Sequence, residues 1–480
     1  MFAFLPRLAV FLLLFTVFAC STHRPGVIRS VAAEKELGDE QKPAFLLSKG
    51  GLYTRTKVQN YVEELTAKLS KNVTIPDGLA PIDIRVLDTN TPSAYALPGG
   101  SIYVSRGIIA MSNTEAQIAG VIAHEIGHVV ARHSAKAVAA NERFILDVIN
   151  QESDRLSQET SQADRIAIVE ESVEARRGEL TSFSKEHELE ADVLALQILT
   201  ASGYETSGYG VLLERLERWQ LARARRAGVT QRELEKITVR SGYPKLTERI
   251  AALGVLKTAA PDEEATGRLM SVIDGTKFDD LYSDGIVQNS KYWNRFLSIS
   301  VDVPDQLLPE HGKYATFLFS KGFIILRVDN GKSSDFAEVV AALSDNDTVS
   351  QDVVTGDING IPTVKVAFPP GKSGEDITAD VIFYDLGRNI VSLTLLSKQA
   401  DRRSNQPLFK EMYQSLKRIK LSDIPKVRRY NTRRLTAQDS VTAIAQQSAF
   451  ERERETEIRI LNGLEIGETL TAGDWIKSIR

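Results

Sequence analysis

The sequence predicts an α+β chain in which a mostly helical domain with a small sheet precedes an antiparallel α+β domain and a short terminal unit. Three observations predict this class. Apolar residues recur at helical spacing within residues 34–72 and 114–140. Short strand-like runs with hairpin-like spacing fill residues 301–396. A stretch with few apolar residues, Lys257–Gly267, resembles a linker between the two regions.

The helices and strands of the first domain are predicted from the spacing of apolar residues and from residues that typically begin or end helices. Alternation predicts a strand over Ile82–Leu87, and a turn at Pro98-Gly99-Gly100 leads into a second strand. Asn113 or Thr114 is the expected cap of the long helix, and Gly203 ends the last one. The expected elements are helical segments within 34–72, strands Ile82–Leu87 and Ser101–Val104, helix Thr114–Ala140, a charged surface helix or lid over 150–182, and helix Ser184–Ala201.

The second domain is expected to be mostly antiparallel, because its apolar runs are short and closely spaced. No His–Glu–His cluster occurs in it, so we interpret it as a binding or structural module. The expected strands are Val301–Val303, Thr316–Phe319, Phe323–Val328, Val364–Phe368, Ala379–Phe383 and Ile390–Leu396, with helices Phe336–Leu343 and Leu408–Ile419.

Length and composition exclude several classes of protein. A chain of 480 residues with 42% hydrophobic and 25% charged residues fits two to four globular domains, not a disordered, collagen-like or polytopic membrane protein. Basic residues number 59 and acidic residues 63, a net charge of −4, which argues against a nucleic-acid partner. A single cysteine, Cys20, excludes a disulfide framework and an all-Cys metal site.

The N-terminus has the pattern of an export signal. Residues 1–19 combine one basic residue, Arg7, with the apolar core Leu8–Phe15, which is too short to span a bilayer. Val17-Phe18-Ala19-Cys20 resembles a bacterial lipobox. We therefore expect lipidation at Cys20 and tethering to a membrane; the alternative is an ordinary signal peptide with a chance cysteine. Ser21 resembles the signal for sorting to the outer membrane.

His124-Glu125-Ile126-Gly127-His128 carries the chemistry. Residues four apart in a helix differ by about 40° in azimuth, so both imidazoles can converge on one Zn²⁺. Glu125 is placed to act on a water at the metal as general base. The surrounding residues are small or aliphatic, which predicts a buried helix where unpaired histidines are costly.

A catalytic zinc needs a third protein ligand. His133 lies five residues after His128, about 140° round the helix, so we expect it to point away. Glu188 and Asp192 lie four apart in a later helix, with Glu188 a candidate ligand and Asp192 a candidate partner for a liganding imidazole. On spacing alone, Glu190 or His187 could replace Glu188 as the ligand.

Together, these two motifs resemble the gluzincin zinc metallopeptidases of the CAAX-prenyl endopeptidase and heat-shock membrane protease family, in its periplasmic lipoprotein branch. The likeness covers residues 30–255 and includes Ser93–Val104, which looks like the family's substrate-side edge strand, and Glu188-Leu189-Glu190-Ala191-Asp192. It implies a zincin-type fold, with Glu188 as third ligand. It also implies that substrate pairs with the edge strand around Tyr95–Leu97.

Two later residues, Tyr243 and Arg249, are further candidates for the site. Relatives often carry a histidine before an Arg-Ile pair, and that histidine can cap the zinc. Here the segment reads Ser241-Gly242-Tyr243-Pro244, followed by Arg249-Ile250. Tyr243 is a candidate to contact the zinc or to donate to the oxyanion, or it is a loop tyrosine without a role. Arg249 is expected to pair with a carboxylate of the site.

The terminal segment resembles a LysM module, a β-α-α-β unit that often binds polymers containing N-acetylglucosamine. The residues that carry the likeness are Leu435–Val441, Leu461-Asn462-Gly463-Leu464 and Gly473-Asp474-Trp475-Ile476-Lys477. Peptidoglycan is therefore a candidate partner. The alternative is a module that only packs against the rest of the chain.

These observations predict four segments: a signal peptide (1–19), a zinc metalloprotease domain (20–256), an α+β domain of unknown role (268–425) and a LysM-like module (430–480). The expected function is hydrolysis of misfolded or unassembled envelope proteins in the periplasm, at the outer membrane of a Gram-negative bacterium. The alternatives are a periplasmic chaperone or a peptidoglycan-anchored scaffold with a latent zinc site.

Overall fold

The computed structural model describes most of the chain. The described residues are 26–158 apart from 80; 165, 168–169, 172–173 and 176; 185–226; 229; 246–253; 262–328 apart from 283–284, 313 and 320; 336–344; and 353–480 apart from 371–375 and 452. The predicted signal peptide, Cys20 and Tyr243 lie outside them. Within the described part, no helix has both the length and the apolar character needed to cross a membrane.

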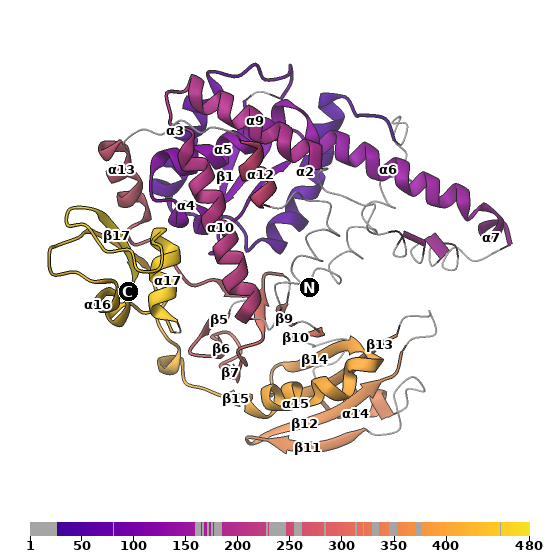
Figure 1. Ribbon diagram of the computed structural model, residues 1–480. Helices are drawn as coiled ribbons and strands as arrows, with labels where there is room; N and C mark the ends of the chain where they lie inside the picture. Colours follow the sequence, from indigo (N-terminus) through magenta and orange to yellow (C-terminus); the bar gives the residue numbers. More distant parts are fainter. Residues whose placement is uncertain are drawn as a thin grey trace.

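The N-terminal part is mostly helical around a three-stranded sheet (Figure 1). The strand order is β1-β3-β2, with β1 parallel and β2 antiparallel to β3, so β2 is an edge strand. The elements are α2 (Val31–Ser48), α3 (Thr56–Ser70), β1 (Asp83–Leu87), β2 (Ala94–Leu97), β3 (Ser101–Ser105), α4 (Arg106–Met111), α5 (Glu115–Val130), α6 (His133–Gln151), α7 (Ser153–Gln158), α9 (Lys185–Ala201), α10 (Ser207–Arg226) and α12 (Leu246–Ala252).

Both long predicted helical stretches are divided in two. The stretch 34–72 breaks between α2 and α3 at Gly50 and Gly51, whose positive φ angles of 83° and 79° suit glycine. The stretch Thr114–Ala140 breaks between α5 and α6 at Arg132, which has a φ of 54°. The Arg132 guanidinium is held by Glu34 at 3.0 Å and by the Arg29 carbonyl at 2.5 Å. A contact with α2 thus stabilises a break that has no glycine or proline.

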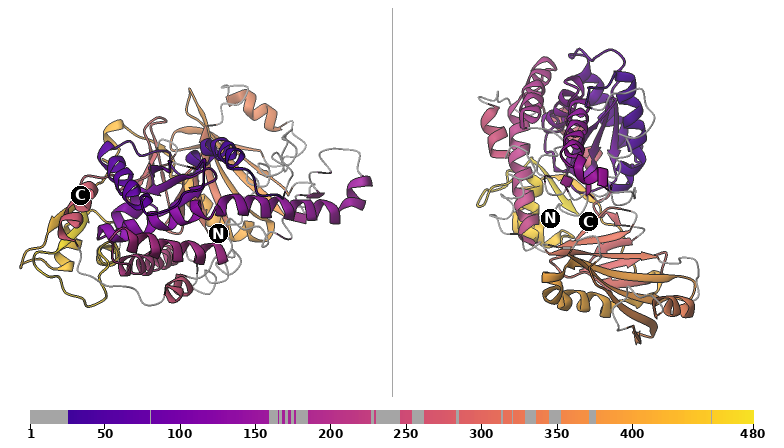
Figure 2. Two further views of the ribbon diagram at one scale, coloured as in Figure 1. Left: turned by 90° about the horizontal axis from the view of Figure 1, so that it is seen from above. Right: turned by 90° about the vertical axis from the view of Figure 1, so that its right-hand side faces the viewer.

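The middle part contains two sheets and confirms the predicted antiparallel architecture. One has the order β11-β12-β13-β14-β10-β9-β8 and the other β15-β7-β6-β5-β4. The seven-stranded sheet lies on the opposite side of the molecule from the N-terminal helices (Figures 1 and 2). The strands are β4 (Leu281–Tyr282), β5 (Gly285–Gln288), β6 (Lys291–Asn294), β7 (Ile299–Asp302), β8 (Leu308–Glu310), β9 (Ala315–Phe319), β10 (Gly322–Val328), β11 (Val354–Ile358), β12 (Ile361–Phe368), β13 (Ile377–Asp385), β14 (Ile390–Lys398) and β15 (Lys417–Arg418).

The described residues of this region also form three helices and a 3-10 turn: α13 (Glu263–Ile273), α14 (Phe336–Ser344), α15 (Gln399–Ser415) and η2 (Leu421–Asp423). The prediction of a linker over Lys257–Gly267 is wrong from Glu263 onward. Asp262 caps α13 by accepting hydrogen bonds from the amides of Glu264 and Ala265, both at 3.0 Å. Leu269 and Met270 of α13 are buried in the same apolar cluster as α5.

The terminal segment has the order β16 (Tyr430–Arg434), α16 (Val441–Gln447), α17 (Arg454–Asn462) and β17 (Trp475–Ile479). Its two strands pair antiparallel. Its buried residues Ile444, Ile458 and Ile476 belong to the same apolar cluster as Ile118 of α5. By contrast, the middle sheets enclose separate clusters. The terminal segment therefore packs as part of the N-terminal core.

Helix α4 is fully buried and is bound at both ends by later segments. At its start, the Arg106 guanidinium donates to the Asp279 carbonyl at 2.8 Å and pairs with Asp88 at 2.8 Å and with Asp280. At its end, the Lys477 ammonium donates to the carbonyls of Ala110, Met111 and Ser112 at 2.7, 3.2 and 3.0 Å. These carbonyls are among those that a helix leaves unsatisfied at its C-terminus. Lys477 therefore acts as a buried cap.

Candidate metal centre

Helix α5 places His124 and His128 on the face that packs against α9. Thr114 caps the helix by accepting a hydrogen bond from the Gln117 amide at 3.4 Å. Both histidines are buried, as is almost every other residue of α5. At Gly127 a Cβ would lie 3.1 Å from the Ala191 carbonyl oxygen, so the missing side chain lets α9 approach closely. This approach brings α9 carboxylates to the two imidazoles.

Three ligand atoms converge at this contact. The Nε2 atoms of His124 and His128 lie 3.0 Å apart. Each is 3.6 Å from one carboxylate oxygen of Glu188. Among the described residues, these three form the one group of His and acidic side chains able to hold a metal ion. Two nitrogens bound to tetrahedral zinc at about 2.0–2.1 Å would be separated by roughly 3.3 Å, so the donor set fits zinc.

Asp192 lies behind His124. The His124 Nδ1 is 2.9 Å from Asp192 Oδ1, which directs the other ring nitrogen, Nε2, toward the cluster. Arg249 of α12 donates to both oxygens of Asp192, at 2.9 and 2.7 Å, and its remaining amino group lies 3.4 Å from Glu188. Tyr209 of α10 donates to Asp192 at 2.8 Å. Tyr209 was not predicted, because no local pattern distinguishes it from a core tyrosine.

The protonation of this cluster follows from burial and charge. Burial and Arg249 lower the pKa of His124, but hydrogen bonds to Asp192 and Glu188 outweigh them and raise it to about 9. Burial and His124 hold the pKa of His128 far below its usual value. His128 is thus held in its neutral form, which is the form of imidazole that binds a metal ion.

Glu125 is buried one residue beyond His124 and is held in a low-dielectric setting. Burial raises the pKa of the Glu125 carboxyl to about 7, and the charge of His124 opposes this rise. A carboxyl group with a pKa near neutrality can both accept and return a proton at physiological pH. This is the protonation behaviour that a general base in hydrolysis requires.

His133 does not point away from the site, and that prediction is wrong. Because the helix breaks at Arg132, the buried His133 ring turns back and its Nδ1 lies 2.9 Å from Nδ1 of His128. Its Nε2 lies 3.1 Å from Glu190, and its ring stacks on His187 at 4.4 Å between centroids. Burial lowers the pKa of His133 to about 4. Glu190 and His187, the alternative ligands, thus lie behind His128.

Strand β2 packs against α5 and is an edge strand of the sheet that the described residues form. Ser93 accepts a hydrogen bond from the Ser105 amide, so by alternation the backbone groups of Ala94 and Ala96 face away from β3. The Ala96 carbonyl already accepts a hydrogen bond from the Ser134 hydroxyl at 3.0 Å. An extended peptide can therefore pair directly at Ala94, but it must displace Ser134 to pair at the Ala96 carbonyl.

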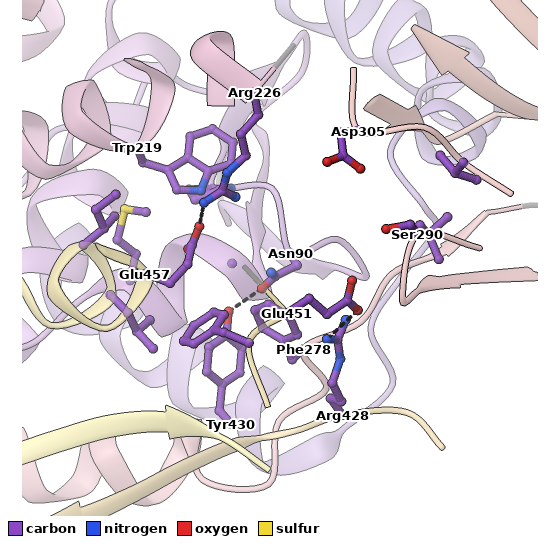
Figure 3. A pocket seen from close by; sticks show the side chains of 18 of the residues that line it. Asn90, Trp219, Arg226, Phe278, Ser290, Asp305, Arg428, Tyr430, Glu451 and Glu457 are labelled. Carbon is purple, nitrogen blue, oxygen red and sulfur yellow. Dashed lines mark hydrogen bonds and ion pairs between the residues drawn. The ribbon is translucent and has the colours of Figure 1, made fainter. Parts of the chain in front are cut away.

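A cavity of about 320 Å³ lies elsewhere, between α10, the middle strands and the terminal segment (Figure 3). Trp219, Arg226 and Glu457 line it on one side, and Arg428 and Glu451 on the other. Four of its charged groups form two pairs: Arg226 with Glu457, and Arg428 with Glu451 at 2.8 Å. None of the predicted site residues lines this cavity, so it is separate from the metal centre.

Comparison with known proteins finds similarity in the part of the chain that contains the metal centre. Residues 56–256 match the model of Peptidase family M48. The β-barrel assembly-enhancing protease of Escherichia coli K12 is 27% identical over 193 residues, 40% of this chain and 39% of that protein. Mitochondrial metalloendopeptidase OMA1 of Schizosaccharomyces pombe is 28% identical over 153 residues, 32% of this chain and 43% of that protein.

A third relative, metalloprotease YcaL of Escherichia coli K12, is 29% identical over 160 residues, 33% of this chain and 59% of that protein. In each case the chain matches less than two thirds of the relative's own length. A solved Pseudomonas aeruginosa protein of unknown function has a TM-score of only 0.18 and 18% identity, with 24% of this chain and 88% of its own covered. The family match includes every described residue of the metal centre.

Proposed function

We propose that this protein is a zinc endopeptidase that hydrolyses misfolded or unassembled proteins of the bacterial envelope. One observation carries the proposal: the two Nε2 atoms and the Glu188 carboxylate converge beside the buried Glu125. The names of the relatives, which include metalloendopeptidases and a β-barrel assembly-enhancing protease, support a peptide substrate. The signal-like pattern of residues 1–20 supports the envelope setting.

Each residue of the metal centre has a separate role in the proposed hydrolysis. His124, His128 and Glu188 would hold the zinc ion, which would supply Lewis-acid activation of a water molecule. Glu125 accepts a proton from the attacking water and returns it to the leaving amine. Asp192 and Arg249 act through His124 and Glu188 rather than on the substrate. The free edge of β2 aligns the substrate backbone, a mode of binding that depends little on sequence.

Metal analysis combined with casein cleavage tests this proposal. The wild-type chain should contain about one zinc per molecule and cleave casein. Glu125→Gln should retain zinc but lose at least ~100-fold in rate, because general base catalysis is removed. Exposed Glu40→Gln is the matched control. Zinc-free wild-type protein, or undiminished cleavage by Glu125→Gln, would contradict the proposal. Persistence of its in vivo role in Glu125→Gln would favour the chaperone alternative.

Tyr243 keeps the role proposed from sequence: contact with the zinc or donation to the oxyanion. Its position lies outside the described residues, so the proposal rests on the sequence alone. Comparison of Tyr243→Phe with the wild type separates this role from that of a loop residue. Loss of the hydroxyl should reduce the rate constant kcat without changing zinc content. Equal rates would remove Tyr243 from the mechanism.

We further propose that the chain is exported and tethered through a lipidated Cys20, which the sequence pattern supports. Cys20→Ala should move the protein from the outer-membrane fraction to the soluble periplasmic fraction. Unchanged fractionation would leave the tether without support.

For the terminal segment, we propose a LysM-like module that contacts peptidoglycan. Its β-α-α-β order supports this. The loop after β16 also meets the loop before β17, where the Leu435 carbonyl accepts a hydrogen bond from the Gly473 amide. Because this segment shares the N-terminal core, point variants are a better test than truncation. Exposed Gln438→Ala and Ile466→Asp should reduce retention on purified sacculi. Equal retention would mean that the module serves packing alone.

A further inference from the structure

A second line of polar groups lies behind His128 and reaches the protein surface. The His133 ring is fully buried, with Nδ1 2.9 Å from Nδ1 of His128 and Nε2 3.1 Å from the Glu190 carboxylate. The Glu190 side chain is 53% exposed. The three groups therefore form a chain from a metal ligand to solvent, and no role in the proposed mechanism has been given to the outer two.

The fold places His133 through long-range contacts. His133 follows Arg132, whose left-handed conformation is fixed by Glu34 and by the Arg29 carbonyl. A continuous helix would carry residue 133 about 140° away from residue 128. The break between α5 and α6 instead brings the two imidazoles into hydrogen-bonding contact, and Glu190 completes the line from α9. Two separate elements thus converge on one side of His128.

The Glu190 carboxylate, at the outer end of this line, determines which ring nitrogen of His133 and of His128 carries the hydrogen. A carboxylate accepts hydrogen bonds, so the His133 nitrogen facing Glu190 carries the hydrogen. A neutral imidazole then has an unprotonated Nδ1, which can only accept from Nδ1 of His128. His128 is left with an unprotonated Nε2 directed at the Nε2 of His124 and at Glu188. That is the tautomer a metal ligand needs.

We propose that His133 and Glu190 are positioning residues that fix His128 in its metal-binding tautomer, as Asp192 does for His124. The inference rests on the metal site of the proposed function and adds a second, independent orienting line to it. Asp192 is buried and paired with Arg249, whereas Glu190 is half-exposed and can be altered without opening the core. The line through His133 can therefore be tested separately.

The test compares two changes at Glu190 in the full chain. Glu190→Leu removes the acceptor, so His133 can move its hydrogen to Nδ1 and force the wrong tautomer on His128. Glu190→Gln keeps an oxygen acceptor. Zinc affinity, measured by competition with a chelator, should fall about 10–100-fold in Glu190→Leu and in His133→Leu. It should stay within about threefold of wild type in Glu190→Gln. Exposed Glu186→Leu, one turn earlier in α9, is the control and should bind normally.

A spectroscopic measurement separates positioning from a general loss of structure. In ¹⁵N-histidine-labelled protein, the His128 ring should carry its hydrogen on Nδ1 in the wild type and in Glu190→Gln. That signature should be lost in Glu190→Leu. Unchanged zinc affinity and an unchanged His128 tautomer in Glu190→Leu would overturn this inference while leaving the proposed function intact. If the wild-type chain bound no zinc and cleaved nothing, the proposed function itself would fail.

Discussion

Helices α4 and α5 follow each other in the chain, and both bury charged or titratable groups, but they use them differently. At α4, carboxylates and backbone carbonyls surround the Arg106 guanidinium, and backbone carbonyls of α4 surround the Lys477 ammonium from β17. In α5, the facing nitrogens of His124 and His128 converge with an acceptor, Glu188, and leave room for an added cation. Burial of charge alone therefore does not identify a reactive site. Converging acceptors do.

The largest effect on stability is expected at Arg106. Arg106→Leu leaves Asp280 buried without its cation, and removal of one partner of a buried pair costs about 3–5 kcal/mol. Urea unfolding followed by tryptophan fluorescence should register this loss. The exposed pair of Arg85 with Glu63 is the control, since Arg85→Leu should cost at most about 1 kcal/mol. Equal costs at the two sites would mean that α4 is not held by its buried pair.

At α5, Asp192→Asn should affect metal binding more than folding. The amide can still accept from His124 but loses the charge that pairs with Arg249, so zinc affinity should fall about 10-fold or more. Exposed Asp147→Asn is the control. Chelator competition measures the change. An unaltered affinity would remove Asp192 from the support of His124.

Lys477→Met should destabilise the chain without altering the metal centre. It removes three donors from the end of α4, which leaves buried carbonyls unsatisfied at a cost of about 1–3 kcal/mol. Exposed Lys410→Met is the control. The expected result is a lower urea midpoint with zinc affinity unchanged. A parallel loss of zinc affinity would show that α4 and α5 are coupled.

The pH dependence of stability should report on the buried pair of Arg106 and Asp280 at α4. Burial opposes ionisation of Asp280, but Arg106, His311 and the Asn90 amide together outweigh it and lower the pKa of this carboxyl below 3.8. The unfolded chain therefore binds this proton first as pH falls, so the contribution is full above about pH 4 and is lost below it. Asp280→Asn should flatten the acid limb of the urea midpoint between pH 5 and 3. An identical acid limb would assign that limb to other carboxylates.

The smallest effect is expected at the substrate edge. Ser134→Ala frees the Ala96 carbonyl, and an average hydrogen bond contributes about 0.5–1.5 kcal/mol. The KM for an extended peptide should fall about 2–10-fold, with kcat nearly constant. A rise in KM would instead mean that Ser134 holds β2 in its binding conformation.

The sequence predicted the parts of this molecule that depend on local spacing. The spacing of His124, Glu125 and His128 predicted both imidazoles on one helix face, and the small and aliphatic neighbours predicted that the helix is buried. The structure has that helix. The choice of Glu188 over Glu190 came from family resemblance rather than spacing, and the structure brings Glu188 to the histidines. The antiparallel strands β9, β10 and β12–β14 were also predicted from short apolar runs.

The features that the sequence did not predict depend on contacts between residues that are far apart in the chain. The break at Arg132 has no glycine or proline to announce it, and Glu34, which holds it, lies 98 residues away. His133 was misplaced for that reason. Tyr209 reaches Asp192 only because α10 packs on α5 at Gly120, where a Cβ would lie 2.7 Å from Tyr209. Strands β4–β6 have two to four residues each, too few for a periodic signal.

The cap at the end of α4 has a consequence for the order of assembly. Lys477 and the Ala110 carbonyl are 367 positions apart, and the ribosome makes the helix long before the lysine. Until the lysine arrives, a growing chain has nothing from β17 to close that end of α4. The nascent peptidase region can therefore reach its final packing only after residue 477 has been made, although α4 itself is synthesised 367 positions earlier.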